Sequence, residues 1–302
     1  MSIVLGPNQY GKAETRVVRV YRDTPRHEIR DLNVSTLLRG DFAAAHARGD
    51  QANVLPTDSQ KNTCFAYAKQ KGVGAIEDYA LDLARHFVAG IGPVSGARID
   101  VEEYRWERVS VDGRPHPHTF VRAGDDVRTT AVTAEDGGRA WVISGLDGLV
   151  VMKTTGSEFH GFLKDRYTTL AETTDRILAT SLAARWRYRA WPPPDGWDAA
   201  HAAIRQILLE RFAEVHSLAL QQSLWEMGQG VLKARADVAE IRLSAPNRHH
   251  FLADLAPFGL DNPGEVFHAA DRPYGLIQCA VQRDDDPAGE AGPAWSGPAA
   301  FA

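Results

Sequence analysis

The sequence predicts an α+β fold made of two tandem units. One observation is the order of elements: each half of the chain runs from strand-like segments through two helical segments and back to strands. A second is that this order occurs twice, which indicates duplication of one unit although the halves share no evident sequence identity. We expect the units to cover residues 1–138 and 139–291. Residues 292–302, rich in Pro, Gly and Ala, are expected to form a poorly ordered tail.

The first half opens with two segments of strand character, residues 12–21 and 26–36, which carry β-branched and long side chains. A helix is predicted over residues 57–71, because Thr57 and Gln60 have the spacing of a capping box and Gly72 can end the helix. A second helix follows, and its apolar residues share one face: Ile76, Tyr79, Ala80, Leu83 and Phe87. Strand character then returns at 97–109 and 118–133, around the turn VDGRP.

The second half repeats the pattern. Residues 140–155 are strand-like, and residues 186–191 offer a partner strand. A helix is predicted over 197–215, with one apolar face formed by Ala200, Ile204, Leu208 and Phe212. A shorter helix over about 221–234 and strands over 239–255 and 264–282 complete the unit.

Composition narrows the class of protein. Of the 302 residues, 44% are hydrophobic and 24% charged, as in ordinary globular proteins, so disulfide or metal staples are not needed for a core. A net charge of −5 argues against nucleic acid as the main partner, because phosphate binding requires concentrated Lys and Arg. No apolar run is long enough for a membrane span, and no signal peptide is evident. With only two cysteines, Cys64 and Cys279, a reducing cytoplasmic location is expected.

Thr57 has two interpretations. Its position at a helix start is typical of an N-cap residue, and this is the simpler explanation. The same position also favours anion binding, because a helix N-terminus offers free N–H groups and a partial positive charge. Asp58 and Lys61 lie close by in the sequence.

The segment PNRHHF, residues 246–251, concentrates polar groups at a predicted strand. On an extended strand Asn247 and His249 point to one side, and Arg248 and His250 to the other. Both histidines therefore should not line one pocket, which argues against a two-histidine metal site. Asn247 and His249 form a hydrogen-bonding pair suited to holding a small molecule and passing a proton. The alternative is a strand end with polar residues in solvent.

Several segments together resemble the uricase (urate oxidase) family along most of the chain. They are NQYGKAETRV (8–17), LPTDSQKNT (55–63), KTTGSEFHGFLKDRYTTLAETTDRILAT (153–180), HSLALQQSLWEMG (216–228), SAPNRHHF (244–251) and DRPYGLI (271–277). The resemblance implies two tandem tunnelling-fold (T-fold) units, with antiparallel sheets and helices on one face. It also implies a homotetramer that forms a tunnel, with active sites shared between subunits. The implied reaction uses neither a metal nor an organic cofactor: O2 oxidises urate to 5-hydroxyisourate and hydrogen peroxide is released.

The resemblance also implies roles for individual residues. Lys12 and Thr57 match the pair that relays a proton, and His249 matches the histidine that completes the relay. Thr57 also contacts the purine, and Asp58 lies beside it. Phe159 matches the ring that stacks on urate, and Arg176 and Gln221 match the two groups that hold the purine edge. Leu220 provides a backbone contact, Asn247 holds O2 or water over the ring, and His250 has no assigned chemistry. The expected shared site takes Lys12, Thr57, Asp58 and His249 from one subunit, and its neighbour provides Phe159, Arg176, Leu220 and Gln221.

Two other functions fit a T-fold protein. A metal-dependent enzyme acting on pterins would need a Cys/His ligand set, which the sequence does not show. A non-catalytic purine-binding scaffold would lack at least one relay residue, yet Lys12, Thr57 and His249 are all present. The chain ends in AAFA rather than S-K-L, which adds to the expectation of a cytoplasmic enzyme.

Overall fold

The computed structural model describes residues 2–270, 272–286 and 292–295. The chain forms two compact units. Unit 1 comprises Met1–Gly145, Ala190–Asp198 and Asp285–Ala302, and unit 2 comprises Leu146–Arg189 and Ala199–Asp284. The T-fold boundaries expected from the sequence, between residues 138 and 139 and at residue 292, stay a prediction.

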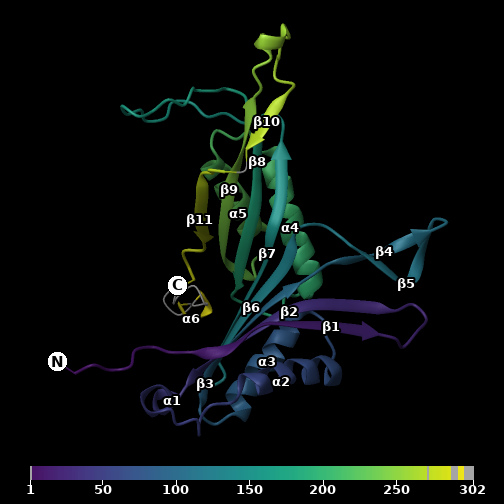
Figure 1. The fold of residues 1–302 in the computed structure, drawn as a ribbon, viewed down its shortest axis with the longest axis vertical. Coiled ribbons are helices and arrows are strands. Elements are labelled where there is room, and N and C mark those ends of the chain that lie inside the picture. Colours follow the sequence, from purple (N-terminus) through teal and green to yellow (C-terminus); the bar gives the residue numbers. More distant parts are fainter. Residues whose placement is uncertain (1, 271, 287–291, 296–302) are drawn as a thin grey trace. The chain divides into compact units, whose positions relative to one another are not determined.

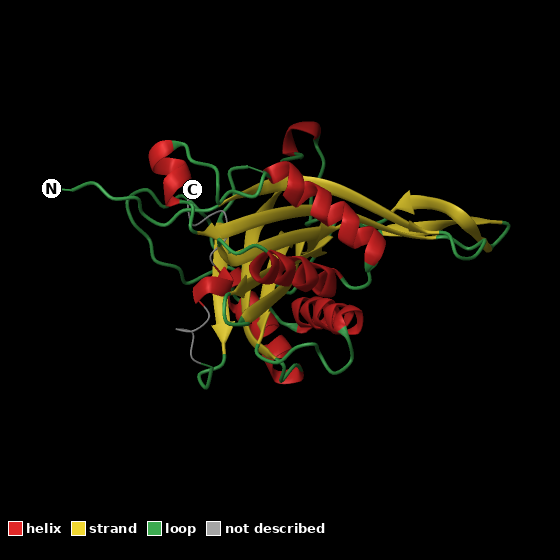
Figure 2. Ribbon diagram, turned by 90° about the horizontal axis from the view of Figure 1, so that it is seen from below, coloured by secondary structure: helices red, strands yellow, loops and turns green. Residues whose placement is uncertain are grey.

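Unit 1 is an antiparallel sheet with helices on one face (Figures 1 and 2). Its strands lie in the order β1 (Tyr10–Tyr21), β2 (Glu28–Gly40), β3 (Val94–Glu103) and β6 (Val127–Glu135), followed by the start of β7 (Ala140–Lys153). Helix α2 (Thr57–Gln70) packs against β1, and α3 (Ile76–Gly90) against β3 and β6. A short helix α1 (Ala43–Arg48) follows β2, and β4 (Trp106–Val111) pairs with β5 (Arg114–Arg122) as a separate hairpin.

The apolar stripe of α3 is the reason that this helix packs on the sheet. Its five predicted positions are all buried, and the helix packs on β3 and β6, whose own buried apolar residues include Ile99 and Val132. A charged network lies beside this core: Arg128 of β6 pairs with the fully buried Glu77 at 2.8 Å and with Asp198 at 2.5 Å. The hydroxyl of Ser144 donates to the other Glu77 oxygen at 2.6 Å. Both oxygens of this buried carboxylate are thus paired, as burial requires.

Unit 2 repeats the arrangement. Strand β7 continues into this unit, followed in the sheet by β8 (Leu178–Tyr188), β9 (Val238–Leu252) and β10 (Phe267–Ala270), and β11 (Leu276–Gln282) also pairs with β9. Helices α4 (Trp197–Glu214) and α5 (Leu220–Ala234) carry buried apolar residues, and a short 3-10 helix η1 (Ala256–Phe258) lies beyond β9. Gly228 lets α5 approach β11 closely, because a Cβ there would lie 2.4 Å from Val281.

The α+β class with antiparallel sheets is confirmed, and several element boundaries are corrected. The predicted strand 97–109 is divided into β3 and β4, and 118–133 into β5 and β6. Strand β8 begins at Leu178, earlier than predicted, and 264–282 is divided into β10 and β11. Within the predicted tail, residues 292–295 form α6 (Gly292–Trp295), where Ala294 packs against Ala131 and Ile143. Residues 296–302 lie outside the described part of the chain.

Candidate active site

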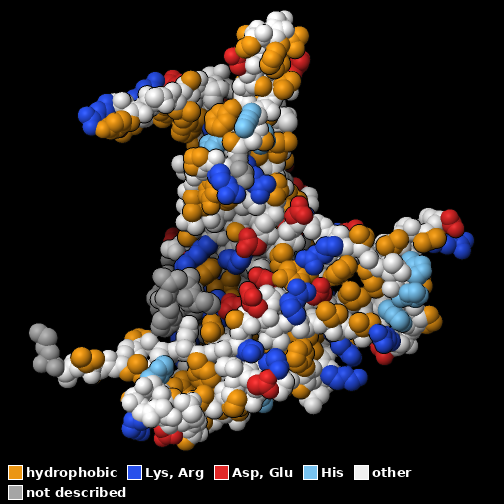
Figure 3. All heavy atoms as spheres, viewed as in Figure 1, with side chains coloured by type: hydrophobic (Ala, Val, Ile, Leu, Met, Phe, Trp, Pro, Cys, Tyr) orange, Lys and Arg blue, Asp and Glu red, His pale blue; other side chains and the backbone are white. Residues whose placement is uncertain are grey.

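Unit 2 contains a cavity of about 530 Å³ beside the outer half of β9. Figure 3 shows histidine and apolar side chains together over this part of the unit. Four residues predicted for the site lie in its wall: Phe159, Arg176, Asn247 and His249. The other lining residues are Thr154, Leu170, Ala171, Thr173, Asp175, Ile177, His250, Phe251, Leu252, Pro263, Gly264 and Phe267.

Strand β9 positions Asn247 and His249. Asn247 pairs with Thr180 of β8, and its N–H donates to the carbonyl of Gly275 at 2.8 Å. His249 pairs with Ala270 of β10, and its ring stacks on Phe251 with centroids 5.6 Å apart. The extended backbone from residue 246 to 251 confirms the predicted strand. However, His250 also lines the cavity, so the expectation that both histidines cannot line one pocket is wrong.

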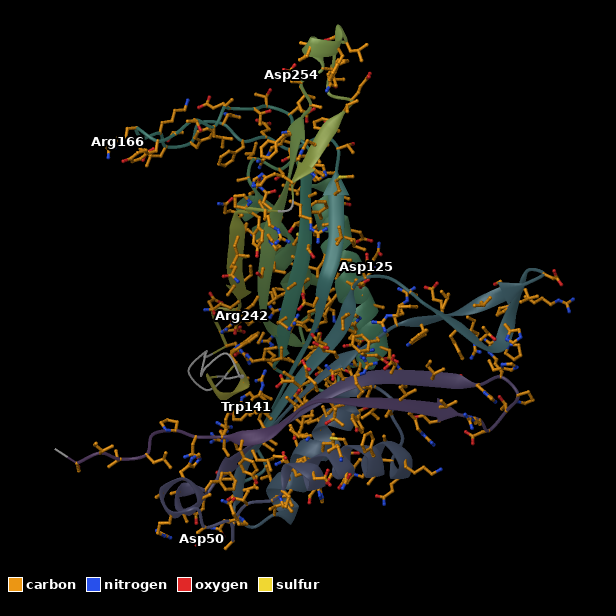
Figure 4. The ribbon with its side chains drawn as sticks, viewed as in Figure 1. Asp50, Asp125, Trp141, Arg166, Arg242 and Asp254 are labelled. Carbon is orange, nitrogen blue, oxygen red and sulfur yellow. The ribbon has the colours of Figure 1, made fainter. Side chains whose placement is uncertain are left out.

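The other wall is an irregular segment between β7 and β8, which backbone hydrogen bonds hold in place. Phe159 and Thr173 exchange two such bonds, at 2.8 and 3.0 Å, and the N–H of Arg176 donates to the carbonyl of Ser157 at 2.9 Å. These bonds place the Arg176 guanidinium 5.1 Å from the centre of the Phe159 ring. Arg166, labelled in Figure 4, lies on the loop that leaves Phe159 and returns at Thr173.

Arg176 places a positive charge in the wall of the cavity, which Asp175 also lines. The Arg176 side chain is half-buried, its Nε donates to the Ser157 hydroxyl at 3.4 Å, and it forms no ion pair with any described residue. Burial lowers the pKa of Arg176, but a guanidinium stays charged at neutral pH. The pKa of His249 is also lowered, first by burial, then by the charges of Arg176 and His250. The cavity therefore combines a planar cation, an aromatic ring, an amide and a histidine that favours its neutral form.

Leu220 and Gln221 lie at the first turn of α5 and do not line this cavity. The Leu220 side chain is buried in the unit, and Gln221 is exposed. The turn before them is nevertheless joined to the Phe159 segment, because the N–H of Glu158 donates to the carbonyl of Ser217 at 2.7 Å. The Glu158 carboxylate also bonds the rings of His160, at 2.6 Å, and His216. Sequence reasoning missed this connection, since Glu158 and His216 are far apart in the chain.

Lys12, Thr57 and Asp58 lie in unit 1. Lys12 is on β1 beside an irregularity in its pairing with β2, Thr57 is the first residue of α2, and Asp58 pairs with Lys61 at 2.5 Å. Lys61, and to a smaller degree Asn62 and Lys12, lower the pKa of Asp58. Among the described residues, no hydrogen bond directly joins the side chains of Lys12 and Thr57.

Two expectations about these residues are wrong. The first is the capping box: Pro56 is the N-cap residue of α2, and no side chain caps the helix. Gln60 is buried and bonds Thr36 and Leu55 instead. The second is the division of the shared site. His249 lies with Phe159 and Arg176 in one cavity of one chain, so the three residues come from the same subunit.

Within residues 2–270, 272–286 and 292–295, no three His, Cys, Asp or Glu side chains are grouped so that they could hold a metal ion. In the same part of the chain, no helix is both long and apolar enough to cross a membrane.

Comparisons with known proteins agree over nearly the whole chain. The family model described as Uricase matches residues 8–133 and 142–278. A uricase of Arthrobacter globiformis is 52% identical over 99% of this chain and 96% of its own length. A uricase of Aspergillus flavus is 36% identical over 91% of this chain and 95% of its own length. The crystal structure of the Arthrobacter globiformis uricase superposes with a TM-score of 0.91 at 49% identity and covers 100% of both chains.

Proposed function

This chain belongs to the uricase family, and we propose that it oxidises urate with O2 in the cavity of unit 2, giving 5-hydroxyisourate and hydrogen peroxide. One observation carries the placement of urate: the Arg176 guanidinium, which forms no ion pair with any described residue, lies 5.1 Å from the Phe159 ring in a cavity that Asn247 and His249 also line. Urate is a flat anion at neutral pH. An arginine fork binds an anionic edge through two parallel hydrogen bonds, and an aromatic ring provides a surface on which a flat ring can stack.

The chemistry assigned to each residue follows from its functional group. Arg176 donates to the anionic edge of the purine. Gln221 does not line the cavity, and we assign to it the remaining part of that edge because an amide both donates and accepts. Phe159 stacks on the ring and adds no charge. Asn247 holds O2, and later water, over the opposite face. Leu220 offers its backbone N–H at the first turn of α5, so the chemistry of its buried side chain is not involved.

Proton removal makes urate a stronger electron donor. We assign this step to Lys12 and Thr57, with neutral His249 completing the relay and Asp58 supporting Thr57. Urate then gives two electrons to O2, which takes up two protons and leaves as hydrogen peroxide. Water adds at the oxidised carbon and produces 5-hydroxyisourate. The donated electrons come from the substrate itself, so the proposal includes neither a metal nor an organic cofactor.

We also propose a cytoplasmic homotetramer in which sites are shared between subunits. In this arrangement Lys12, Thr57 and Asp58 of one subunit complete the cavity of its neighbour. The matching of site segments to the uricase family supports the assembly. Two free thiols, Cys64 and Cys279, fit a reducing compartment.

An assay in air tests the function. Purified protein, dialysed against a strong chelator, is expected to consume urate and to produce one hydrogen peroxide for each urate. Arg176→Ala is the matched variant, because it removes only the cation of the cavity, and its KM for urate should rise by at least tenfold, as loss of a charged hydrogen bond does.

Each contrary result has a distinct meaning. Activity that disappears on chelation and returns with added metal would contradict a cofactor-independent reaction. Urate that binds but is not consumed would indicate a purine-binding scaffold. An unchanged KM in Arg176→Ala would show that urate is not held in this cavity.

A further inference from the structure

Thr36 and Gln60 form a buried hydrogen bond between β2 and α2. The Thr36 hydroxyl donates to Gln60 Oε1 at 2.7 Å, and the exposed fractions of the two residues are 1% and 0%. A polar pair inside a core is costly unless it is fully bonded. Filling of the core does not explain this pair, because an apolar pair of similar size would fill the same space without that cost.

The pair connects the backbones of the two proposed relay elements. On one side, the N–H of Lys12 donates to the Thr36 hydroxyl oxygen at 3.3 Å. On the other side, Gln60 Nε2 donates to the carbonyl of Leu55 at 3.4 Å, two residues before Thr57. A continuous chain of side-chain bonds thus runs from the backbone of Lys12 through Thr36 and Gln60 to the turn that begins α2.

Lys12 is the last residue of β1 in regular register before an irregularity. It pairs with Thr36, and regular pairing resumes only at Thr15, opposite Val34, so the ladder supports Lys12 on one side alone. The turn before Thr57 is likewise a helix start without a side-chain cap. A second contact supports this turn, since the Tyr10 hydroxyl donates to the same Leu55 carbonyl at 3.1 Å. The bridge between Thr36 and Gln60 adds a constraint that connects the two sides.

We propose that Thr36 and Gln60 are positioning residues that set the spacing of Lys12 and Thr57 for proton transfer. The proposal rests on the relay assigned under the proposed function. Neither residue touches urate, so both act through the backbone of the relay. A relay depends steeply on geometry, and a displacement of about 1 Å can cost up to a hundredfold in rate.

Thr36→Val and Gln60→Met remove the bridge with little change in side-chain volume. Each is expected to lower kcat by about tenfold while the KM for urate changes less than about twofold, because Arg176 and Phe159, which are proposed to hold the purine, are not affected. Thr36→Ser keeps the hydroxyl and should restore most of kcat. In a Thr57→Ala background, adding Thr36→Val should cause no further loss, since residues that act as one unit are not additive.

Tyr79→Phe is the matched structural control. The Tyr79 hydroxyl is also buried and donates to a backbone carbonyl of α2, that of Cys64, at 2.7 Å. Its removal should lower the apparent Tm about as much as Thr36→Val does and leave kcat unchanged. All rates are measured below the lowest Tm of the set, and Gln60→Met serves if Thr36→Val does not fold.

The possible outcomes separate this proposal from the function on which it rests. If Lys12→Met and Thr57→Ala retain the wild-type rate, the relay assignment itself fails. If both are slow while Thr36→Val and Gln60→Met match wild type, only the positioning role is overturned. The same conclusion follows if Tyr79→Phe loses as much kcat, or if the losses of Thr36→Val and Thr57→Ala multiply.

Discussion

Two basic side chains, Arg176 and His249, line one cavity. Their proximity determines how the site responds to acid. The pKa of His249 lies below its usual value of about 6.5, because burial and then the charges of Arg176 and His250 disfavour its protonation. Folding thus favours the neutral imidazole. The stability that the neutral imidazole gives to the folded protein is fully present above the pKa that His249 has in the unfolded chain. It is lost as the pH falls from that value through the lower pKa of His249 in the folded protein.

The lowered pKa of His249 also predicts how the reaction rate falls at acid pH, the acid limb of its pH profile. If neutral His249 is needed, kcat/KM for urate should fall only below about pH 6.5, once His249 begins to charge. His250→Gln removes one of the charges that disfavour protonation, so it should move this limb to higher pH. The check is a pH series of kcat/KM between pH 5 and 8.

His268→Gln is the control for this series. His268 lies on β10 and is exposed, but it does not line the cavity. Its replacement should leave the limb in place. A limb that moves to lower pH in His250→Gln, or moves equally in both variants, would contradict the assignment to His249.

At the scale of elements, the pairing of β1 with β2 depends on two unusual backbone positions. A Cβ at Gly11 would lie 1.7 Å from the carbonyl oxygen of Thr36, so only glycine fits. Glu14 has φ of 55°, in the left-handed region that costs a non-glycine residue about 1–2 kcal/mol. The two positions lie on either side of Lys12 and define the local irregularity.

Substitutions at Gly11 and Glu14 are therefore expected to differ in their effect on stability. Gly11→Ala should lower the free energy of unfolding by about 3 kcal/mol, because the backbone of β2 must move away. Glu14→Gly should change it by less than about 1 kcal/mol, since relief of strain offsets the added freedom of the unfolded chain. Urea unfolding followed by circular dichroism measures both.

Gly6→Ala provides the comparison. No atom lies within 4 Å of a Cβ built at Gly6, so stability should stay at the wild-type value. If Gly11→Ala were as stable as Gly6→Ala, the close contact with Thr36 would be wrong.

Periodicity predicted the elements that bury a continuous face. The α3 stripe is an example, and its ends at Ile76 and near Gly90 follow the sequence signals. The turn between β4 and β5 was predicted from VDGRP, but the separation of β4 from β3 was not. No Gly or Pro marks the break at Tyr104 and Arg105, and tertiary pairing decides where each strand ends. The Ala-rich α1 is only 6 residues long, too short for a periodic signal.

In the candidate site, too, local patterns predicted some features and missed others. Alternation along β9 placed Asn247 and His249 on one side, and both line the cavity, but it wrongly excluded His250. Local spacing misassigned Gln60, because the hydroxyl of Thr36, 24 positions earlier, competes for its side chain. The bond between Glu158 and His216 had no signal either, since the two are separated by 58 positions. Contacts between distant segments are set by packing of the whole unit, which one sequence does not reveal.

At the scale of the whole molecule, the predicted site residues are divided between the two units. Lys12, Thr57 and Asp58 belong to unit 1, and the cavity residues to unit 2. Under the proposed shared site, Thr57→Ala and Arg176→Ala expressed together should complement each other. A twofold interface gives each mixed pair one intact site, so about a quarter of wild-type activity is expected. The measurement is the urate oxidation rate per mole of co-expressed protein.

A second co-expressed pair makes the result specific. Arg176 and Asn247 line the same cavity of one chain, so Arg176→Ala and Asn247→Ala should not complement each other. Thr57→Ala and Arg176→Ala folded separately and then mixed should also stay inactive, because large interfaces exchange subunits slowly. If the first pair recovers no activity, each site is complete within one chain.

The division of the chain into units has a consequence for synthesis on the ribosome. Unit 1 includes residues 190–198, which the ribosome makes only after the first strands of unit 2. Among them, Asp198 is the partner of Arg128, and Trp197 donates to Asp78 at 2.8 Å. A nascent chain translated only to Gly145 therefore lacks groups that its own charged network needs. Domains often fold one after another during translation, but unit 1 receives its residues 190–198 only after residues 146–189 of unit 2 have been made.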